Sequence, residues 1–229
     1  MDTRIEIAEF LKRILASPGE RQEIDYKAAM PFKQGTDFSL SLVRHVQGMA
    51  NTGGGWLVIG FMETDEGLVP DTAHSDTITS SYEPTDFSQY INKFVARGQH
   101  IDLSIYTEEN PETKQTHPII AVEGFQRGPY ICRSDVKACD TKETVLEAGA
   151  VYVRRTSAST SKVSDPSDWD ELIQRCVAAR RDEFLSEFRN LLDLMTSGSP
   201  LEQTEAVDDL RDWTIEMRTS ALGVEERKR

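Results

Sequence analysis

The sequence is poor in cysteine, in basic residues and in long apolar runs. Its 229 residues include three cysteines, Cys132, Cys139 and Cys176, which are widely spaced and form no C-x-x-C pair. This pattern supports neither a disulfide framework nor a zinc site, so we expect free thiols. No apolar stretch approaches the ~20 residues of a membrane-spanning helix, and residues 1–16 are too charged for a signal peptide. We therefore expect a soluble, cytoplasmic protein without membrane association.

The deficit of basic residues bears on the class of partner. The chain has 26 Lys and Arg against 39 Asp and Glu, a formal net charge of -13. Such a balance disfavours a polyanion partner, because nucleic-acid affinity comes largely from Lys and Arg displacing counterions at phosphates. The charge is unevenly distributed, with a net 0 over 1–44, -9 over 45–125, +2 over 126–160 and -6 over 161–229. The neutral and mildly basic segments leave room for a narrow phosphate-binding face.

Hydrophobic periodicity predicts an α/β (α+β) fold, a small mixed sheet flanked by helices. Apolar residues recur at helical spacing over 3–16 and 38–50, and Thr36 or Asp37 can cap the second helix. Alternation predicts a strand at 24–28, and a continuous apolar run predicts a strand buried on both faces at 56–61.

The remaining chain divides into shorter predicted elements. We expect a long exposed loop over 62–85, a helix over 86–97, strands over 101–107, 117–124 and 149–155, a Ser/Thr-rich linker over 157–167, and helices over 168–195 and on to about 220. The domain organisation that follows is one α/β domain over 1–180 and a C-terminal helical extension over 181–229.

Three acidic residues, Glu20, Glu23 and Asp25, lie with Lys27 within eight residues before and on the first predicted strand. Asp25 and Lys27 point to one face of this strand, away from Ile24 and Tyr26, and Glu20 precedes it. Carboxylates can hold a divalent cation and a lysine can stabilise a phosphate, an arrangement suited to phosphodiester hydrolysis. Charged residues at this spacing also occur on solvated surfaces, so the spacing alone decides nothing.

Three ordered motifs resemble the Schlafen AlbA_2 domain family. Residues 20–27 fit the family's E-x4-E-[FY]-K motif, with Asp25 in place of the second Glu, and 49–60 (MANTGGGWLVIG) fit its helix end, glycine turn and apolar strand. Residues 149–157 (GAVYVRRTS) fit its G-x-Y-x-R strand, and Asp168 to Ile173 fit the helix after it. The resemblance covers about residues 5–180 and implies a single lobe of the Schlafen core.

The resemblance also implies an activity and a set of site residues. Schlafen lobes cleave tRNA or rRNA with three acidic residues and a divalent metal, Mg²⁺ or Mn²⁺. Carried over, the catalytic and metal-binding acids are Glu20, Asp25 and Glu63, and Lys27 stabilises the transition state. The family's I-G-V-D-D appears here with Met62 and Glu63 at the acidic positions. A one-residue slip would turn Glu63 away from the other two acids, and Asp65 is then the alternative.

Residues for contact with nucleic acid follow from the second and third motifs. Lys27 and Asn51 are candidates, although Asn51 and the glycines after it can equally cap the helix and form a tight turn. Arg154 and Arg155 point to opposite sides of a strand, so at most one joins a substrate surface while the other pairs with carboxylates.

The apolar residues of the C-terminal helices favour self-association. Leu185, Phe188, Leu191, Leu192 and Met195 exceed what a peripheral helix needs. Because one lobe makes half of the two-lobed Schlafen core, we expect a homodimer through these helices.

Three hypotheses follow. The first is a Schlafen-like, metal-dependent endoribonuclease acting on structured RNA such as tRNA, in prokaryotic antiviral defence or as a toxin. The second is a non-catalytic nucleic-acid-binding or regulatory AlbA_2 module, which the departures at Asp25 and Met62 favour. The third is an acidic protein-interaction subunit with an additional, basic protein partner.

Overall fold

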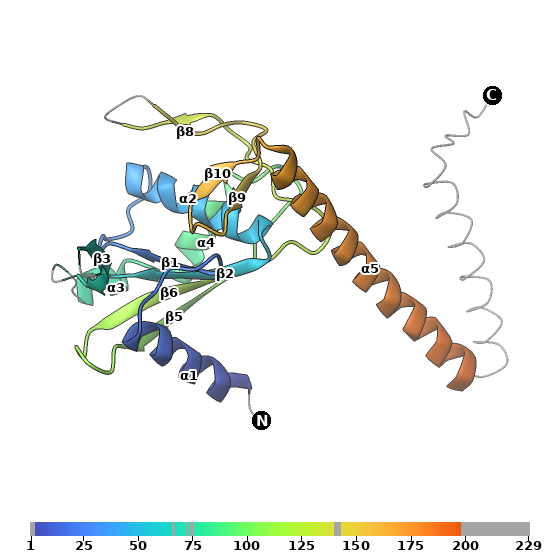
Figure 1. Ribbon diagram of the computed structural model, residues 1–229, viewed down its shortest axis with the longest axis horizontal. Helices are drawn as coiled ribbons and strands as arrows, with labels where there is room; N and C mark the ends of the chain where they lie inside the picture. Colours follow the sequence, from blue (N-terminus) through green and yellow to red (C-terminus); the bar gives the residue numbers. More distant parts are fainter. Residues whose placement is uncertain (1–2, 66, 72, 74–75, 140–142, 198–229) are drawn as a thin grey trace. The chain divides into compact units, whose positions relative to one another are not determined.

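The structure, a computed structural model, describes residues 3–65, 67–71, 73, 76–139 and 143–197, and Figure 1 shows how their helices and strands are arranged. The chain divides into two compact units, Met1–Cys176 and Val177–Arg229. The division falls within a single long helix, α5 (Pro166–Ser197). Within the described residues, no helix is long and apolar enough to cross a membrane.

A four-stranded mixed sheet lies at the centre of the first unit. Its strand order is β1-β2-β6-β5, with β1 parallel to β2 and the other neighbours antiparallel. The strands are β1 (Ile24–Lys27), β2 (Gly54–Ile59), β5 (Leu103–Glu109) and β6 (Thr116–Glu123). The mixed sheet and its flanking helices confirm the predicted α+β fold.

Helices cover both faces of this sheet (Figure 1). On one face, α1 (Thr3–Ala16) packs its apolar stripe of Leu11, Ile14 and Leu15 against Tyr26 and Val58. On the other face lie α2 (Asp37–Asn51) and α4 (Pro84–Asn92), which pack against apolar residues of β2 and β6. β2 is therefore buried on both faces, which explains its continuous apolar sequence.

The start of α2 follows from local chemistry. Thr36 is extended and its side chain accepts a hydrogen bond from the backbone N–H of Ser39, while the Ser39 hydroxyl accepts one from the backbone of Thr36. This capping box selects Thr36 over Asp37 as the helix cap. It fixes the register in which the inward stripe of α2 faces the sheet.

The predicted loop over 62–85 was wrong. β3 (Phe61–Thr64) and β4 (Gly67–Pro70) form an antiparallel hairpin, and the short helix α3 (Asp76–Ser80) follows. In β3 only Phe61 is buried, so the strand has no apolar alternation by which it could be recognised. Gly67 supplies the positive φ of +116° after the turn.

The predicted boundaries at 149–167 also need correction. β9 (Tyr152–Arg154) is shorter than the predicted strand, and the Ser/Thr-rich segment contains β10 (Thr160–Lys162), which pairs antiparallel with β9. Ser/Thr composition does not separate an edge strand from a linker, which is why β10 was missed. The helix predicted beyond residue 200 lies outside the described residues.

Two short strands and a helix boundary differ as well. The segment before residue 149, for which no element was predicted, contains the ladder of β7 (Val136–Lys137) and β8 (Thr144–Leu146). The helix predicted over 86–97 is α4, which begins at Pro84 because Glu83 caps it by accepting from the Asp86 N–H. Proline is favoured in the first helical turn, where its missing N–H costs nothing.

Candidate functional site

β1 separates two kinds of side chain onto its two faces. Ile24 and Tyr26 face α1 and belong to the apolar core on that side. Asp25 and Lys27 lie on the opposite side and contact each other and His45 of α2. The period of two in this short strand thus confirms the predicted facing of Asp25 and Lys27.

Asp25 is the centre of a buried cluster of charged side chains. Its Oδ2 lies 2.8 Å from Lys27 Nζ and 3.3 Å from His45 Nδ1, and its Oδ1 lies 3.2 Å from Arg154 Nη2. Asp25 is 1% exposed and the Arg154 side chain 0%, whereas the Lys27 side chain is 21% exposed. The cluster therefore places one ammonium group within reach of solvent above a buried carboxylate. We call Asp25, Lys27, His45 and Arg154 the Asp25 cluster.

The charges of the cluster decide the protonation state of Asp25. Burial raises the pKa of this carboxyl, but its neighbours, the charge of Lys27 first and then His45 and Arg154, hold its pKa below the ordinary value. Asp25 is thus a carboxylate whose two oxygens already face cationic partners within the protein.

His45 is neutral at neutral pH. Burial and then the charge of Lys27 lower the pKa of His45 to about 3, and Arg44 and Arg154 act in the same direction. Its Nδ1 lies 3.1 Å from Thr160 Oγ1 as well as 3.3 Å from Asp25 Oδ2. Because both contacts use the same ring nitrogen, they do not form a nucleophile relay, which needs one partner on each nitrogen.

Arg154 connects β9 to β1 from the interior of the protein. Its guanidinium donates to the backbone oxygens of Arg21 and Ile24, in addition to its ion pair with Asp25. Its backbone N–H donates to Thr52 Oγ1 at 2.9 Å. This buried side chain holds the strands together through its Nε and Nη2 and is not placed to touch a substrate. Its Nη1 is buried without a hydrogen-bond partner among the described residues.

Arg155, on the other side of the chain, is paired with carboxylates of the α5 region. Its Nη2 lies 3.0 Å from Asp165 Oδ2 and 2.8 Å from Asp168 Oδ2. A cavity of about 190 Å³ beside it is lined by charges of both signs, Arg154, Arg155 and Arg175 against Asp168 and Glu171. This mixed lining does not form a basic surface.

Asn51 serves the protein's own backbone. Its Nδ2 donates to the carbonyl oxygens of Tyr130 and Tyr152, both at 2.9 Å, and its Oδ1 accepts from the Tyr130 N–H at 2.7 Å. Of the two roles considered for Asn51, the structure therefore assigns it to the end of α2, where it anchors two neighbouring segments.

The glycines after Asn51 allow strands to approach closely. Gly54 has a φ of +94°, and a Cβ there would lie 2.6 Å from the backbone oxygen of Val122. A Cβ on Gly55 would lie 2.7 Å from the backbone oxygen of Glu23. The close approach that glycine permits here is to neighbouring backbone of the same chain.

The predicted acids are only partly brought together. Glu20 lies near Asp25, and its pKa is raised by burial and then by the charge of Asp25. Glu63 lies on the exposed β3–β4 hairpin, opposite Leu68, and Asp65 at the turn is exposed as well. Gly60, with a φ of +105°, ends β2 and starts this hairpin in a new direction, so the strand alternation does not carry through to Glu63.

The three carboxylates do not fit a metal centre in this arrangement. Within the ranges that the structure describes, no group of three or more His, Cys, Asp and Glu side chains could hold a metal ion. Glu20 and Asp25 form a pair, and the cations around Asp25 already neutralise it. No step through Mg²⁺ or Mn²⁺ follows from this geometry.

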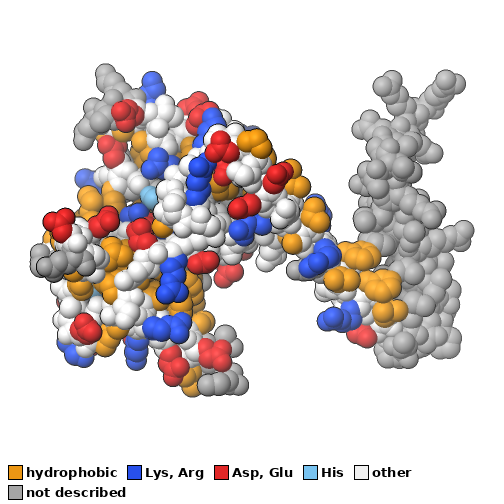
Figure 2. All heavy atoms as spheres, viewed as in Figure 1, with side chains coloured by type: hydrophobic (Ala, Val, Ile, Leu, Met, Phe, Trp, Pro, Cys, Tyr) orange, Lys and Arg blue, Asp and Glu red, His pale blue; other side chains and the backbone are white. Residues whose placement is uncertain are grey.

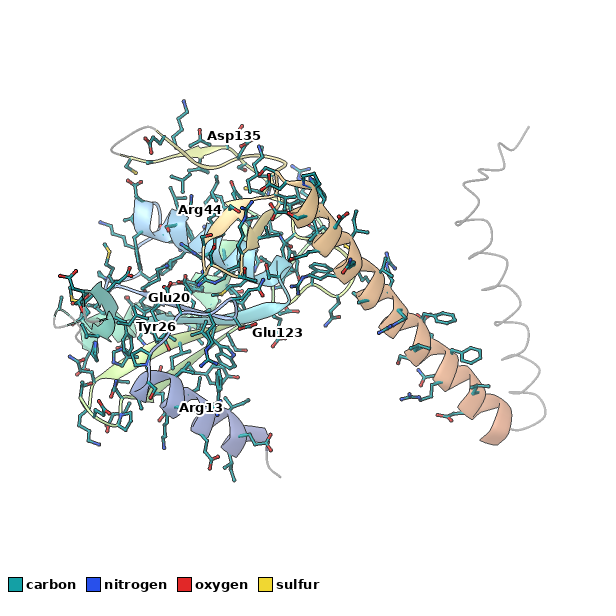
Figure 3. The ribbon with its side chains drawn as sticks, in the orientation of Figure 1. Arg13, Glu20, Tyr26, Arg44, Glu123 and Asp135 are labelled. Carbon is teal, nitrogen blue, oxygen red and sulfur yellow. The ribbon has the colours of Figure 1, made fainter. Side chains whose placement is uncertain are left out.

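His45 and Arg44 were missed by sequence reasoning. His45 follows Leu42 by three residues and precedes Met49 by four, so it lies on the inward stripe of α2. A polar residue on such a stripe is the signal that could have identified it. Figure 3 shows Arg44 on the α2 side of the sheet and Glu20 near β1, while Arg13 lies on the α1 side.

Comparisons with known proteins add little to this site. No family model and no curated protein matches the chain. Among solved structures, the chain is similar to the DIP2311 protein of Corynebacterium diphtheriae, with 18% sequence identity and a TM-score of 0.43. The match covers 74% of this chain, which spans only 29% of that protein. A likeness this low supports no argument, so the function is argued from the chain's own residues.

Proposed function

We propose that the chain is a nucleic-acid-binding module of the AlbA_2 type that contacts phosphate through Lys27 and does not cleave the strand. The observation that carries this proposal is the internal pairing of Asp25 with Lys27 and Arg154. A carboxylate held by two cations is poorly suited to bind a metal ion, but it is well suited to fix the position of a lysine. We propose structured RNA such as tRNA as the partner and the cytoplasm as the location of this function.

The electrostatics around His45 favour an anionic partner at the same place. Burial is the largest cause that lowers the pKa of His45, and the charge of Lys27 is the second. Arg44 and Arg154 also lower it, while the charge of Asp25 raises it. Three cations, Lys27, Arg44 and Arg154, therefore act on His45 against the carboxylate of Asp25. A positive site within a negative surface confines a polyanion to one approach.

The face of the protein drawn in Figure 2 is consistent with confined contact. On the face drawn in Figure 2, Lys and Arg lie interspersed with Asp and Glu and do not form a continuous basic band. Few phosphates can then be contacted at once, so binding is expected to be weak and strongly reduced by salt.

A binding assay tests the proposal. Fluorescence anisotropy of a labelled tRNA and a labelled single strand, at low salt and with EDTA present, is measured for the wild type and for Lys27→Ala. Loss of a hydrogen bond to a charged group, ~1.5 kcal/mol or more, weakens binding at least about tenfold. Lys114→Ala is the matched control, because Lys114 is 70% exposed and pairs with Glu109 on the β5–β6 hairpin. No binding by the wild type, or equal losses in both variants, contradicts the proposal.

A second candidate is a metal-dependent endoribonuclease, the activity that the Schlafen resemblance implies. The influence of the Asp25 charge on the pKa of Glu20 favours it, because two neighbouring carboxyl groups are a common start of a cation site. Incubating total tRNA with Mn²⁺ separates the two functions. Cleavage that EDTA and Glu20→Gln both abolish would replace the binding module by the nuclease.

We further propose that the chain forms a homodimer through α5. Val177, Leu185 and Phe188 are 63%, 48% and 39% exposed on the part of α5 that belongs to the second unit. Apolar side chains repeated along one helix commonly form helix–helix interfaces. Light scattering is expected to give twice the monomer mass, and Phe188→Glu is expected to give the monomer. A monomeric wild type at micromolar concentration contradicts this proposal.

A further inference from the structure

A second cavity lies on the other side of β1, between this strand and α1. Its volume is about 420 Å³, and its lining includes two arginines, Arg13 and Arg21, and the apolar or aromatic side chains of Phe10, Ile14, Ile24 and Tyr26. It shares none of these residues with the Asp25 cluster, because Ile24 and Tyr26 face away from Asp25 along the strand. It is therefore a separate place on the molecule.

The charge of this cavity is opposite to that of the protein as a whole. Its lining contains two guanidinium groups and no carboxylate, in a chain whose net charge is -13. In the part of the chain that the structure describes, neither Arg13 nor Arg21 forms a side-chain ion pair. Two guanidinium groups without carboxylate partners are donors suited to a phosphate, which they can bind in bidentate fashion.

Arg21 is held in place by its backbone. Its N–H donates to the Ile24 oxygen at 3.0 Å, and its own backbone oxygen accepts from the buried guanidinium of Arg154. The Arg21 side chain is exposed. The main chain is thus fixed while the guanidinium is available to a ligand. Arg13 lies over the Phe10 ring, 5.4 Å from its centroid, at the last turn of α1.

The apolar wall of the cavity adjoins a row of aromatic rings. Phe10 contacts Trp56 with ring centroids 5.1 Å apart, and Trp56 contacts Tyr106 at 5.9 Å. All three rings are partly exposed. Rings of this kind are the surfaces on which nucleobases stack, and arginine adds a cation–π contribution.

From these features we infer that the cavity between α1 and β1 binds a nucleotide. The base packs against Phe10 and the apolar wall, and the phosphate lies between Arg13 and Arg21. The volume is within the ~300–1,000 Å³ of small-molecule sites and exceeds what inorganic phosphate alone would fill. Because a free mononucleotide and an unpaired nucleotide of a strand share this chemistry, both are probes. The inference stands apart from the proposed function, since free AMP suffices to test it.

Titration calorimetry with AMP, adenosine, inorganic phosphate and a short 5′-phosphorylated single strand tests the site. AMP is expected to bind more tightly than adenosine or phosphate alone, and Arg13→Ala and Arg21→Ala are each expected to raise its Kd at least about tenfold. Lys12→Ala is the matched control, since the Lys12 side chain is 60% exposed on the same helix and does not line the cavity. Its Kd is expected to stay within twofold of the wild type.

A second variant examines the base. Phe10→Leu keeps an apolar side chain and removes the ring. It is expected to weaken AMP binding without changing the affinity for phosphate, and an unchanged thermal midpoint shows that it folds. A strand that binds more tightly than AMP, with a Kd that Arg13→Ala and Arg21→Ala raise, identifies the source as nucleic acid, and the reverse identifies a free nucleotide. Absence of binding by both probes at millimolar concentration, or arginine variants that bind like Lys12→Ala, overturns the inference.

Discussion

Replacing Asp25 by Asn removes the negative charge on which the buried end of Arg154 depends. The exchange keeps the size and shape of the side chain, so packing is conserved. Asp25 Oδ1 and Arg154 Nη2 lie 3.2 Å apart, and the two side chains are 1% and 0% exposed. After the exchange, an uncompensated guanidinium remains in the interior, which costs ~3–5 kcal/mol. Lys27 adds less, because it reaches solvent and can be hydrated there.

The expected loss is a large part of the stability of such a domain. Domains have a free energy of unfolding of ~5–15 kcal/mol, so a loss of ~3–5 kcal/mol in Asp25→Asn should remove roughly a fifth of it or more. At ~2–4 °C per kcal/mol for a chain of this size, the midpoint should fall by at least ~6 °C. Urea unfolding followed by circular dichroism gives the free energy, and calorimetry gives the midpoint.

The control for this experiment is an ion pair at the surface. Glu109→Gln removes the partner of Lys114, 3.4 Å away, where both side chains are more than half exposed. It should change the free energy of unfolding by less than ~1 kcal/mol. If Asp25→Asn costs no more than Glu109→Gln, the Asp25 cluster does not hold β9 to β1 and the reasoning is refuted.

Three further outcomes follow from the same structure. The pKa of His45 is lowered to about 3, so its contribution to stability is complete above pH 6.5 and is lost as the pH falls toward 3. A ¹⁵N titration should therefore show a neutral His45 ring at pH 5. A charged ring at that pH contradicts the buried position of His45. The pKa of Glu20 is raised, so this side chain opposes folding once it is ionised. Glu20→Gln should therefore raise the free energy of unfolding slightly at pH 7, by less than ~0.5 kcal/mol, and not at all below pH 4.5. Destabilisation at pH 7 would falsify the repulsion between Glu20 and Asp25. Gly54→Ala should lower the free energy of unfolding by more than ~1 kcal/mol, because the φ of Gly54 is +94° and a Cβ there would lie 2.6 Å from the Val122 backbone oxygen. A variant as stable as the wild type would exclude that close approach.

The major helices and the strands of the central sheet were predictable because their periodicity is strong. α1 and β2 carry continuous apolar patterns, and the predicted range 3–16 coincides with α1. The β3–β4 hairpin and β10 were not predictable in the same way. Their exposed polar residues carry no alternation, and their pairing depends on turns and on neighbours far away in the chain.

Only those contacts of the candidate site that join residues close together in the sequence were predictable. Asp25 and Lys27 are two residues apart on one strand, so their common facing follows from local geometry. Arg154 reaches Asp25 from 129 positions further along the chain, and His45 reaches it from a helix on the sheet. Such contacts depend on tertiary packing, which no spacing in the sequence displays. The same packing buries Arg154, which its sequence motif made a candidate for contact with nucleic acid.

The most direct test of the account follows binding and integrity of a labelled tRNA in one sample, with EDTA and then with Mn²⁺. If Asp25 serves the protein internally and Lys27 contacts phosphate, the wild type should form a complex under both conditions and the tRNA should stay intact. Lys27→Ala should weaken that complex, whereas Lys114→Ala should not. Cleavage that requires Mn²⁺ and disappears in the Glu20→Gln variant would contradict the account.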